Sequence, residues 1–465
     1  MTQLTVRSRR IHTPDGWRDG VIVVDDGRVT AIVAPGEEPA AEHHVDATER
    51  VVIPGLVDTH AHLRDPGFTH KEDVTSGTMA AAAGGVTTVL DMPNVQPPTT
   101  DPATLRAHLA NMAAKAVVDF GHNTASTIPG NIAGLAEAGA TAFKVFMMSD
   151  VGRSYPHMPG IAVDDHATLF QICEAVARTG RPLFVHAWDQ AIYELFVERA
   201  IAEWGRDFRS YARAGRMGGG IVWDAGISTM LELQRATGVR LHVLHLMTIG
   251  GLELIRAAKA VGRAVTAEVN PHSLFVANSW ANVERLGPYA LHMWVPDDHA
   301  TALWQATLDG TIDVVGSDHA PHTREEKERG WTDMYAAPGG SPSLQHYLSL
   351  FLTEVAAGRI DLDRVVELCS TAPARLVDLY PRKGAIAPGS DADLVVVDLE
   401  RQDVITAEGA YSKAGWTNLE GRAVTGLPVM TILRGRVIAV DGIVDTEPGT
   451  GAPVTAPATA PEVRA

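Results

Sequence analysis

Two histidines that could bind a metal ion follow a short apolar run at residues 51–57. His60 and His62 are separated by one residue, and side chains two apart in a strand point the same way, so both imidazoles could face one ion. Two histidines at this spacing, without other evidence, are more often incidental than part of a metal site. Here Arg64 and a Pro-Gly pair follow at once. They predict a turn at the end of the strand, where catalytic residues commonly lie.

Further candidate ligands are distributed one at a time along the chain. Apolar runs typical of parallel strands occur at residues 86–91, 142–146, 182–186, 240–245, 264–268 and 313–318. Helical patterns alternate with them. The carboxyl ends of the strands of a parallel barrel share one face, where active sites are found. We therefore expect the titratable residues of these runs to converge with the first pair, giving the set His60, His62, Lys144, His186, His245 and Asp318.

Lys144 and His242 also lie in these runs. Lys144 lies within an apolar strand, where an ammonium ion is costly to bury, so it should either reach solvent or be chemically altered. His242 lies three residues before His245 and should face the other side of its strand, so we interpret it as structural.

Three separated motifs resemble those of the cyclic amidohydrolases, which include dihydroorotase, allantoinase and the hydantoinases (dihydropyrimidinases). They are PGLVDTHAHLRDPG, AAAAGGVTTVLDMPN and GSDHAPHT, and the resemblance extends over residues 1–445. It implies an α/β fold with a (β/α)8 TIM-type barrel at residues 54–384. A small β-sandwich domain would be formed by both termini, residues 1–53 and 385–445, consistent with the alternating patterns and the hairpin turns at residues 25–27 and 434–435.

The resemblance also implies a pair of divalent metal ions. His60, His62 and Asp318 would bind one ion and His186 and His245 the other, with Lys144, carboxylated by CO2, between them. The resemblance and the imidazole-rich set favour Zn2+, although manganese, cobalt or iron would also suit these ligands. The metals would supply a bridging hydroxide. Asp318 would take its proton and pass it to the leaving nitrogen. His322 is expected to contact substrate, and His319 has no assigned role.

Arg64 and Asn94 match the positions that bind the ring carboxylate in dihydroorotases. A planar guanidinium pairs well with a carboxylate. The alternative is that Arg64 pairs with Asp65 or Glu72 in a rim loop.

Other features depart from dihydroorotases. Typical bacterial long-form dihydroorotases lack the FKVFM run at residues 143–147, which is more like the allantoinase and hydantoinase branch. Their PPLR loop is replaced by HMWVPDD at residues 292–298, where Trp294 and Asp297 are expected to reshape the pocket. Their PHHL motif becomes PHSL at residues 271–274.

The sequence therefore predicts a metal-dependent hydrolase that opens a cyclic amide or ureide bearing a carboxylate, with dihydroorotate as the leading substrate. One alternative is allantoinase or hydantoinase (dihydropyrimidinase) activity on a neutral ring. A remote alternative is a non-catalytic, dihydropyrimidinase-like scaffold. Such scaffolds usually lose ligands, whereas all six are present here.

Composition limits the remaining possibilities. A chain of 465 residues exceeds the roughly 250–300 that one core supports, which favours two domains. With 39 Lys+Arg against 56 Asp+Glu and no basic patch, nucleic acid is not an expected partner. The two cysteines lie in helical patterns and are expected to be buried, reduced thiols.

The chain shows no signal-peptide pattern and no apolar run long enough for a membrane span. These features predict a soluble, cytoplasmic protein. The resemblance implies a homo-oligomer, a dimer or tetramer. Residues 446–465 are rich in Pro, Ala and Thr and are predicted to be a disordered tail.

Overall fold

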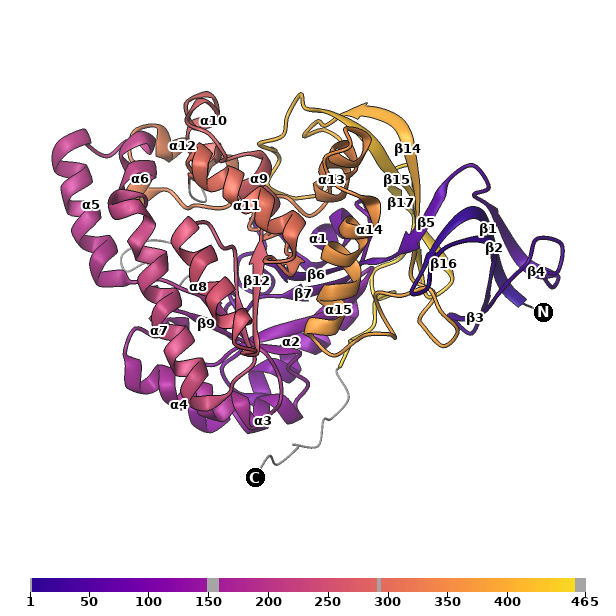
Figure 1. The fold of residues 1–465 in the computed structure, drawn as a ribbon, viewed down its shortest axis with the longest axis horizontal. Coiled ribbons are helices and arrows are strands. Elements are labelled where there is room, and N and C mark those ends of the chain that lie inside the picture. Colours follow the sequence, from indigo (N-terminus) through magenta and orange to yellow (C-terminus); the bar gives the residue numbers. More distant parts are fainter. Residues whose placement is uncertain (1, 149–158, 291–293, 456–465) are drawn as a thin grey trace.

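The computed structural model describes residues 2–148, 159–290 and 294–455. A barrel of parallel strands surrounded by helices fills one side of the molecule, and a second sheet, built from both ends of the chain, lies beside it (Figure 1). The predicted fold class is therefore confirmed.

The barrel strands are hydrogen-bonded to one another in chain order, and all neighbouring pairs are parallel. An isolated parallel bridge between Ala61 and His319 joins the last strand region to the first. The strands are β6 (Leu56–Ala61), β7 (Val86–Asp91), β8 (Asp119–Ala125), β9 (Ala142–Phe146), β10 (Leu183–His186), β11 (Leu241–Val243), β12 (Val265–Val269) and β13 (Val314–Val315).

Helices follow most of the barrel strands and pack their apolar faces against the outside of the barrel. The α-helices of the described residues are α1 (Val74–Ala83), α2 (Pro102–Lys115), α3 (Ile132–Glu137), α4 (His166–Ala177), α5 (Gln190–Trp204), α6 (Phe208–Ala214), α7 (Ile221–Thr237), α8 (Ile249–Ala260), α9 (Pro271–Phe275), α10 (Trp280–Leu286), α11 (Asp297–Asp309), α12 (Arg324–Glu328), α13 (Tyr347–Ala356), α14 (Leu362–Val366) and α15 (Ala372–Leu376).

The second sheet has nine strands, and the hydrogen-bonded pair β5 and β14 joins its N-terminal and C-terminal parts. Its two halves share an apolar core that includes Leu4, Val52 and Ile432. The hairpin turns predicted at residues 25–27 and 434–435 connect β2 to β3 and β15 to β16. The strands are β1 (Thr2–Thr13), β2 (Gly16–Asp25), β3 (Arg28–Val33), β4 (Ala41–Asp46), β5 (Val51–Pro54), β14 (Leu394–Val404), β15 (Ala423–Leu433), β16 (Arg436–Val440) and β17 (Ile443–Val444).

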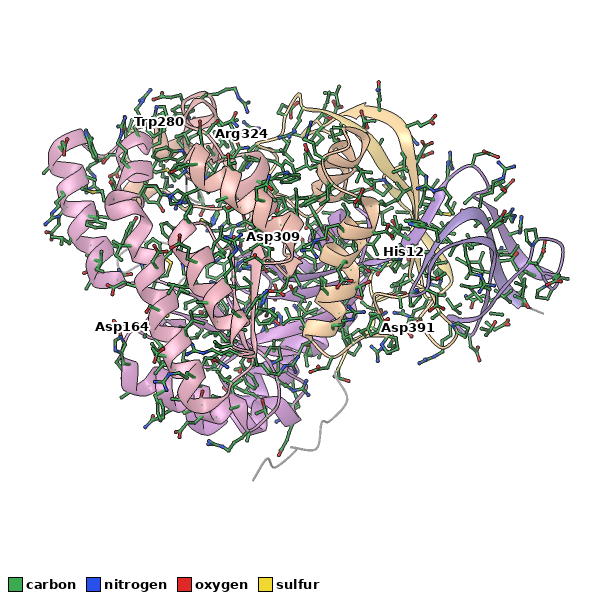
Figure 2. The ribbon with its side chains drawn as sticks, in the orientation of Figure 1. His12, Asp164, Trp280, Asp309, Arg324 and Asp391 are labelled. Atoms are coloured by element: carbon green, nitrogen blue, oxygen red, sulfur yellow. The ribbon has the colours of Figure 1, made fainter. Side chains whose placement is uncertain are left out.

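Contacts between ionisable side chains connect the two units. His12 of β1 lies 3.2 Å from Asp363 of α14, and Figure 2 shows His12 where the sheet meets the barrel. The buried Lys383 ammonium lies 2.5 Å from both Asp119 of the barrel and Asp393, which precedes β14. A buried ammonium needs such partners, so Lys383 couples the start of β8 to the second sheet.

The C-terminal segment differs from its prediction. Residues 446–455, expected to be disordered, are ordered and lie against the barrel. The Val454 N–H donates to the Phe120 carbonyl at 2.7 Å, and the Phe120 N–H donates to the Ala452 carbonyl at 3.0 Å. Val454 is 2% exposed and joins the apolar cluster inside the barrel. Burial of this valine helps to order a segment that has few other apolar residues to bury. The rest of the predicted tail, residues 456–465, lies outside the described residues.

Cys173 and Cys369 are free and buried, as predicted. Burial raises the pKa of the Cys173 thiol to about 12. Within the described ranges, every helix is too short or too polar to cross a bilayer.

Candidate active site

The six predicted ligands come together in one pocket, to which the carboxyl ends of several barrel strands contribute. His60 is on β6, Lys144 on β9 and His186 on β10, and the remaining ligands lie in the loops that follow their strands. The shared lining is His60, His62, Lys144, His186, His245 and Asp318, together with Arg64. The predicted convergence of the six side chains is therefore confirmed.

Asp318 lies between the first two histidines. Its Oδ1 atom is 3.2 Å from His60 Nε2 and 3.5 Å from His62 Nε2. On the other side of His60, the His245 ring centroid is 5.6 Å away, and the His186 and His245 centroids are 4.5 Å apart. Ligand atoms at this spacing can surround a divalent cation.

Three pocket residues have an unusual backbone. Arg64, His245 and Asp318 have φ angles of 62°, 34° and 47°, in the left-handed region that side chains other than glycine rarely adopt. Such conformations persist where the surrounding structure enforces them, and they cluster at functional sites. Here each lies just beyond the end of a strand and turns a side chain into the pocket.

Lys144 is fully buried, and within the described residues its Nζ atom has no hydrogen-bond partner. Burial lowers the pKa of Lys144 to about 7, although Asp318 and Glu268 oppose this shift. The Phe146 ring centroid lies 4.3 Å from Nζ. The side chain therefore does not reach solvent, which leaves chemical modification or a bound group as the way to satisfy it.

The donor set fits a pair of divalent ions. Besides Lys144 Nζ, the buried Nδ1 atoms of His62 and His245 lack hydrogen-bond partners in the described part of the chain. Burial lowers the pKa of both rings, so both are neutral near pH 7, as metal ligands must be.

Glu268 contacts two of the predicted ligands and was not predicted from the sequence. Its Oε1 atom lies 2.8 Å from His60 Nδ1 and also accepts the His245 N–H at 3.1 Å. It lies on β12 and is fully buried. A signal was present, since an acidic residue inside an apolar strand is expensive unless it is paired.

His242 does not occupy the face predicted for it. Its Nε2 atom lies 3.8 Å from Glu268 Oε2, so it contacts the same carboxylate as the His245 backbone. The reason is that β11 ends at Val243. The alternation of a strand therefore does not extend to His245.

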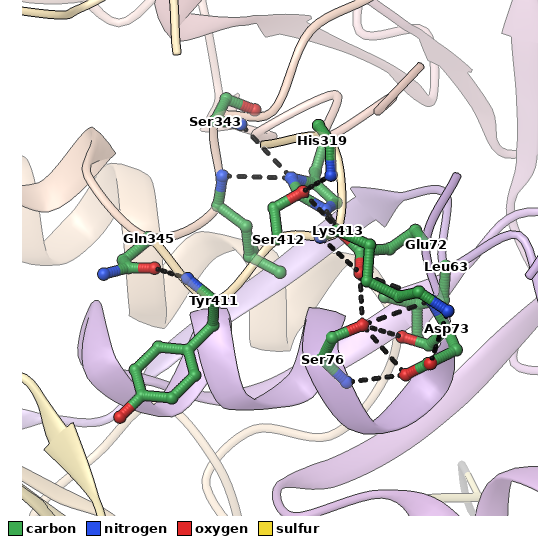
Figure 3. A network of polar contacts seen from close by, with 12 residues as sticks. Leu63, Glu72, Asp73, Ser76, His319, Ser343, Gln345, Tyr411, Ser412 and Lys413 are labelled. Carbon is green, nitrogen blue, oxygen red and sulfur yellow. Dashed lines mark hydrogen bonds and ion pairs between the residues drawn. The ribbon is translucent and has the colours of Figure 1, made fainter. Parts of the chain in front are cut away.

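His319, which had no assigned role, anchors the turn that carries Asp318. Its Nε2 atom lies 3.2 Å from Glu72 Oε2, and its Nδ1 atom accepts the Ser343 N–H at 3.2 Å. Its carbonyl also accepts the His62 N–H at 2.7 Å. Figure 3 shows Ser412 reaching the same Glu72 carboxylate from a distant part of the chain.

Arg64 lines the pocket and is 3% exposed. His322 lies behind it, with Nε2 3.5 Å from Arg64 Nη2 and Nδ1 3.3 Å from Lys71 Nζ. Asn94 is buried in the loop after β7. In the part of the chain that the structure describes, neither Asn94 nor His322 is a lining residue of the pocket. Asp65 and Glu72 were the alternative partners predicted for Arg64. The Asp65 carboxylate forms an ion pair with Lys115, and the Glu72 carboxylate lies within ion-pair distance of His319.

Much of the remaining lining of the pocket is apolar or aromatic, from Phe146, Met148, Trp188, Tyr211, Trp223 and Met247. Trp294, expected to reshape the pocket, packs edge-on against Trp280 at 4.9 Å between ring centroids. Neither Trp294 nor Asp297 is among the described residues that line the pocket. Residues 292 and 293 of the same loop lie outside the described residues.

Comparison with known proteins agrees with this architecture. The amidohydrolase family model matches residues 51–438. Dihydroorotase from Methanosarcina acetivorans is 32% identical, with 97% of this chain and 95% of that protein covered. Allantoinase from Streptomyces avermitilis is 35% identical, with coverage of 95% and 96%. The solved L-hydantoinase (dihydropyrimidinase) from Arthrobacter aurescens is 33% identical with a TM-score of 0.91, covering 98% of this chain and 100% of that one. The chain therefore belongs to the amidohydrolase family, as a hydrolase of cyclic amides.

Proposed function

We propose that this enzyme opens a cyclic amide or ureide ring that carries a carboxylate, with dihydroorotate as the leading substrate. The observation that carries the proposal is Arg64, a buried guanidinium in the wall of the pocket that holds the six ligands. A buried positive charge beside a reaction centre is suited to an anionic substrate.

Asn94 would assist Arg64 in binding the ring carboxylate. Both follow a barrel strand at the same end of the barrel, Arg64 after β6 and Asn94 after the neighbouring β7. His322 would act through Arg64, because its Nε2 atom lies 3.5 Å from the guanidinium. Together they would orient the ring so that its scissile amide faces Asp318.

Two divalent ions would be held by His60, His62, Lys144, His186, His245 and Asp318, and the resemblance together with the imidazole-rich donors favours zinc. When bound, they would activate water and polarise the scissile carbonyl. Asp318 would accept the proton from the attacking water and deliver it to the leaving nitrogen. Its position between His60 and His62 and its hydrogen bond from Asn270, at 3.3 Å, hold the carboxylate in place for this transfer.

Lys144 would be carboxylated by CO2. The neutral amine of Lys144 would form an N–C bond to CO2 and lose one proton, giving a carbamate with two oxygens available as metal ligands. The buried Nζ, which has no hydrogen-bond partner among the described residues, supports this assignment, because a carbamate would be a metal ligand where an ammonium ion is costly to bury.

A second candidate substrate is a neutral ring, as hydantoinase or allantoinase activity would require. The apolar wall around Trp188, Trp223 and Met247 favours it, because that surface offers burial to a hydrophobic group rather than to a charge. Dihydroorotate would leave much of this wall without a complementary group.

A ring-opening assay separates the two candidates. Purified, zinc-loaded protein would be tested side by side against dihydroorotate, allantoin, hydantoin, a 5-benzyl hydantoin and dihydrouracil. Preference for dihydroorotate supports the carboxylate proposal. Preference for a neutral ring would mean that the apolar lining determines the substrate, and it would overturn the carboxylate proposal.

The enzyme would act as a homo-oligomer, a dimer or tetramer, as the resemblance to its family implies. Light scattering coupled to gel filtration tests this directly, and a single monomeric species would contradict it.

A further inference from the structure

A second cluster of metal-binding side chains lies outside the active-site pocket. Asp91 ends β7, His108 is in the middle of α2 and His122 is on β8. They are 0%, 3% and 0% exposed. A carboxylate and two imidazoles buried together need either shared protons or a cation to be stable.

The cluster repeats the spacing of the catalytic ligands. Asp91 Oδ2 lies 3.0 Å from His108 Nε2 and 3.4 Å from His122 Nδ1. The corresponding distances from Asp318 Oδ1 to the two histidines of the active site are 3.2 and 3.5 Å. Ligand atoms about 2.0–2.1 Å from a tetrahedral zinc ion are separated by roughly 3.3 Å. Both sets are therefore spaced as the ligand atoms of one ion could be, and the three ligand atoms of the second cluster all lie within 4.8 Å of one another.

Two other polar atoms of the cluster have hydrogen-bond partners. His122 Nε2 lies 2.7 Å from the Thr99 hydroxyl, and Asp91 Oδ1 accepts the Leu63 N–H at 2.8 Å. When His122 Nε2 donates to Thr99, the lone pair of Nδ1 faces Asp91 Oδ2. In that tautomer, a cation between these two electron-rich atoms would satisfy both.

The protonation state of His122 agrees with ligation. Within the described residues, its Nδ1 atom has no hydrogen-bond partner. Burial, followed by the charge of His108, lowers the pKa of His122 to about 4. The ring is therefore neutral near pH 7, which is the form that binds metals.

We propose that Asp91, His108 and His122 bind a third divalent ion, which has a structural rather than a catalytic role. Two imidazole nitrogens and one carboxylate oxygen suit zinc, with a remaining position for water. The proposal is independent of the substrate of the enzyme, because it concerns a separate set of ligands.

Such an ion would stabilise the catalytic turn. The Leu63 N–H that Asp91 accepts lies in the chain between His62 and Arg64. An ion that ties Asp91 to His108 of α2 and His122 of β8 would fix the position of Asp91. Asp91 would in turn hold the turn that carries His62 and Arg64.

Anomalous X-ray diffraction at the zinc edge tests the proposal on the full-length, zinc-loaded protein. The expected result is a peak between Asp91, His108 and His122 in addition to those of the catalytic pocket. Peaks in the pocket without one at this cluster would overturn the proposal, leaving a hydrogen-bonded His–Asp–His triad.

Metal content provides an independent measurement. His108→Leu and His122→Gln should each hold one zinc ion per chain fewer than the wild type after dialysis, as measured by mass spectrometry of the metals. The exposed His166→Gln is the matched control and should lose none. Equal metal content in all four proteins would overturn the proposal. The measurement compares the zinc content of each variant with that of the wild type. Its interpretation therefore does not depend on how many ions the catalytic pocket binds.

Discussion

The Nδ1 atom of His60 lies 2.8 Å from the Oε1 atom of Glu268, and both side chains are buried. Burial alone would raise the pKa of Glu268, but His60 and His242 bring it below its ordinary value, so the carboxylate stays charged. A charged acceptor at Nδ1 fixes the tautomer of His60 that leaves the Nε2 lone pair free. That Nε2 atom faces Asp318 and the proposed metal site.

Glu268→Gln should therefore weaken metal binding without changing the fold. An amide has nearly the same shape but lacks the charge that orients and polarises His60. Loss of such a partner lowers metal affinity by about 10- to 100-fold. Competition with a chelator measures the affinity, and Glu284→Gln, in an exposed ion pair with Arg209, is the control. Unchanged metal affinity in Glu268→Gln would show that Glu268 does not position His60.

Lys144→Ala should lose both bound metals and hydrolysis, because the proposed carbamate is the ligand that both ions share. Carbon-13 NMR of protein equilibrated with labelled CO2 should show a carbamate signal in the wild type that is absent from the variant. Lys259→Ala, a partly exposed lysine paired with Asp313, is the control. A fully active Lys144→Ala enzyme would remove Lys144 from the site.

The sequence predicted the barrel and the six ligands because each ligand lies in or directly after an apolar strand, and parallel strands bring such positions together. The runs at residues 86–91 and 142–146 match β7 and β9 at both ends. The strand β8 was missed because its sequence, DFGHNTA, has polar residues at most positions. Its burial comes from the surrounding barrel rather than from its own composition.

The relationships that support the ligands could not be predicted in the same way. Glu268 and His60 are 208 residues apart in the chain, and Ser412 reaches Glu72 across 340 residues. No local pattern encodes such pairs. The order of residues 446–455 was missed for a similar reason, since a single buried valine and a few backbone hydrogen bonds decide it.

Arg64→Ala should raise KM for acidic substrates on the order of 10- to 100-fold, the loss expected for a charge-assisted hydrogen bond. Neutral hydantoins should be little affected, because they do not need the guanidinium. Steady-state kinetics on both substrate types give the comparison, with the exposed Arg206→Ala as control. Equal effects on acidic and neutral substrates would exclude Arg64 as a determinant of specificity.

The pH dependence of stability should report on Lys327. Burial lowers the pKa of Lys327 from 10.5 to about 7. Between these values the unfolded chain binds the proton and the folded chain does not, so rising pH stabilises the folded state. The wild type should therefore gain stability relative to Lys327→Met between pH 7 and pH 10, on the order of a few kcal/mol. Urea unfolding at both pH values measures this gain, and a difference that is constant with pH would contradict the shifted pKa.

Val454→Ala should destabilise the protein, because Val454 fills the interior of the barrel from the C-terminal segment. Truncation of a buried valine leaves a cavity, and the expected cost is about 2 kcal/mol. The matched control is Val261→Ala at the end of α8, where the side chain is 73% exposed and the change should be within about 0.5 kcal/mol. Thermal unfolding at one scan rate compares the two variants. Equal melting temperatures would mean that the segment does not pack in the barrel in solution, whereas a lower value for Val454→Ala alone would show that residues 446–455 are part of the folded core.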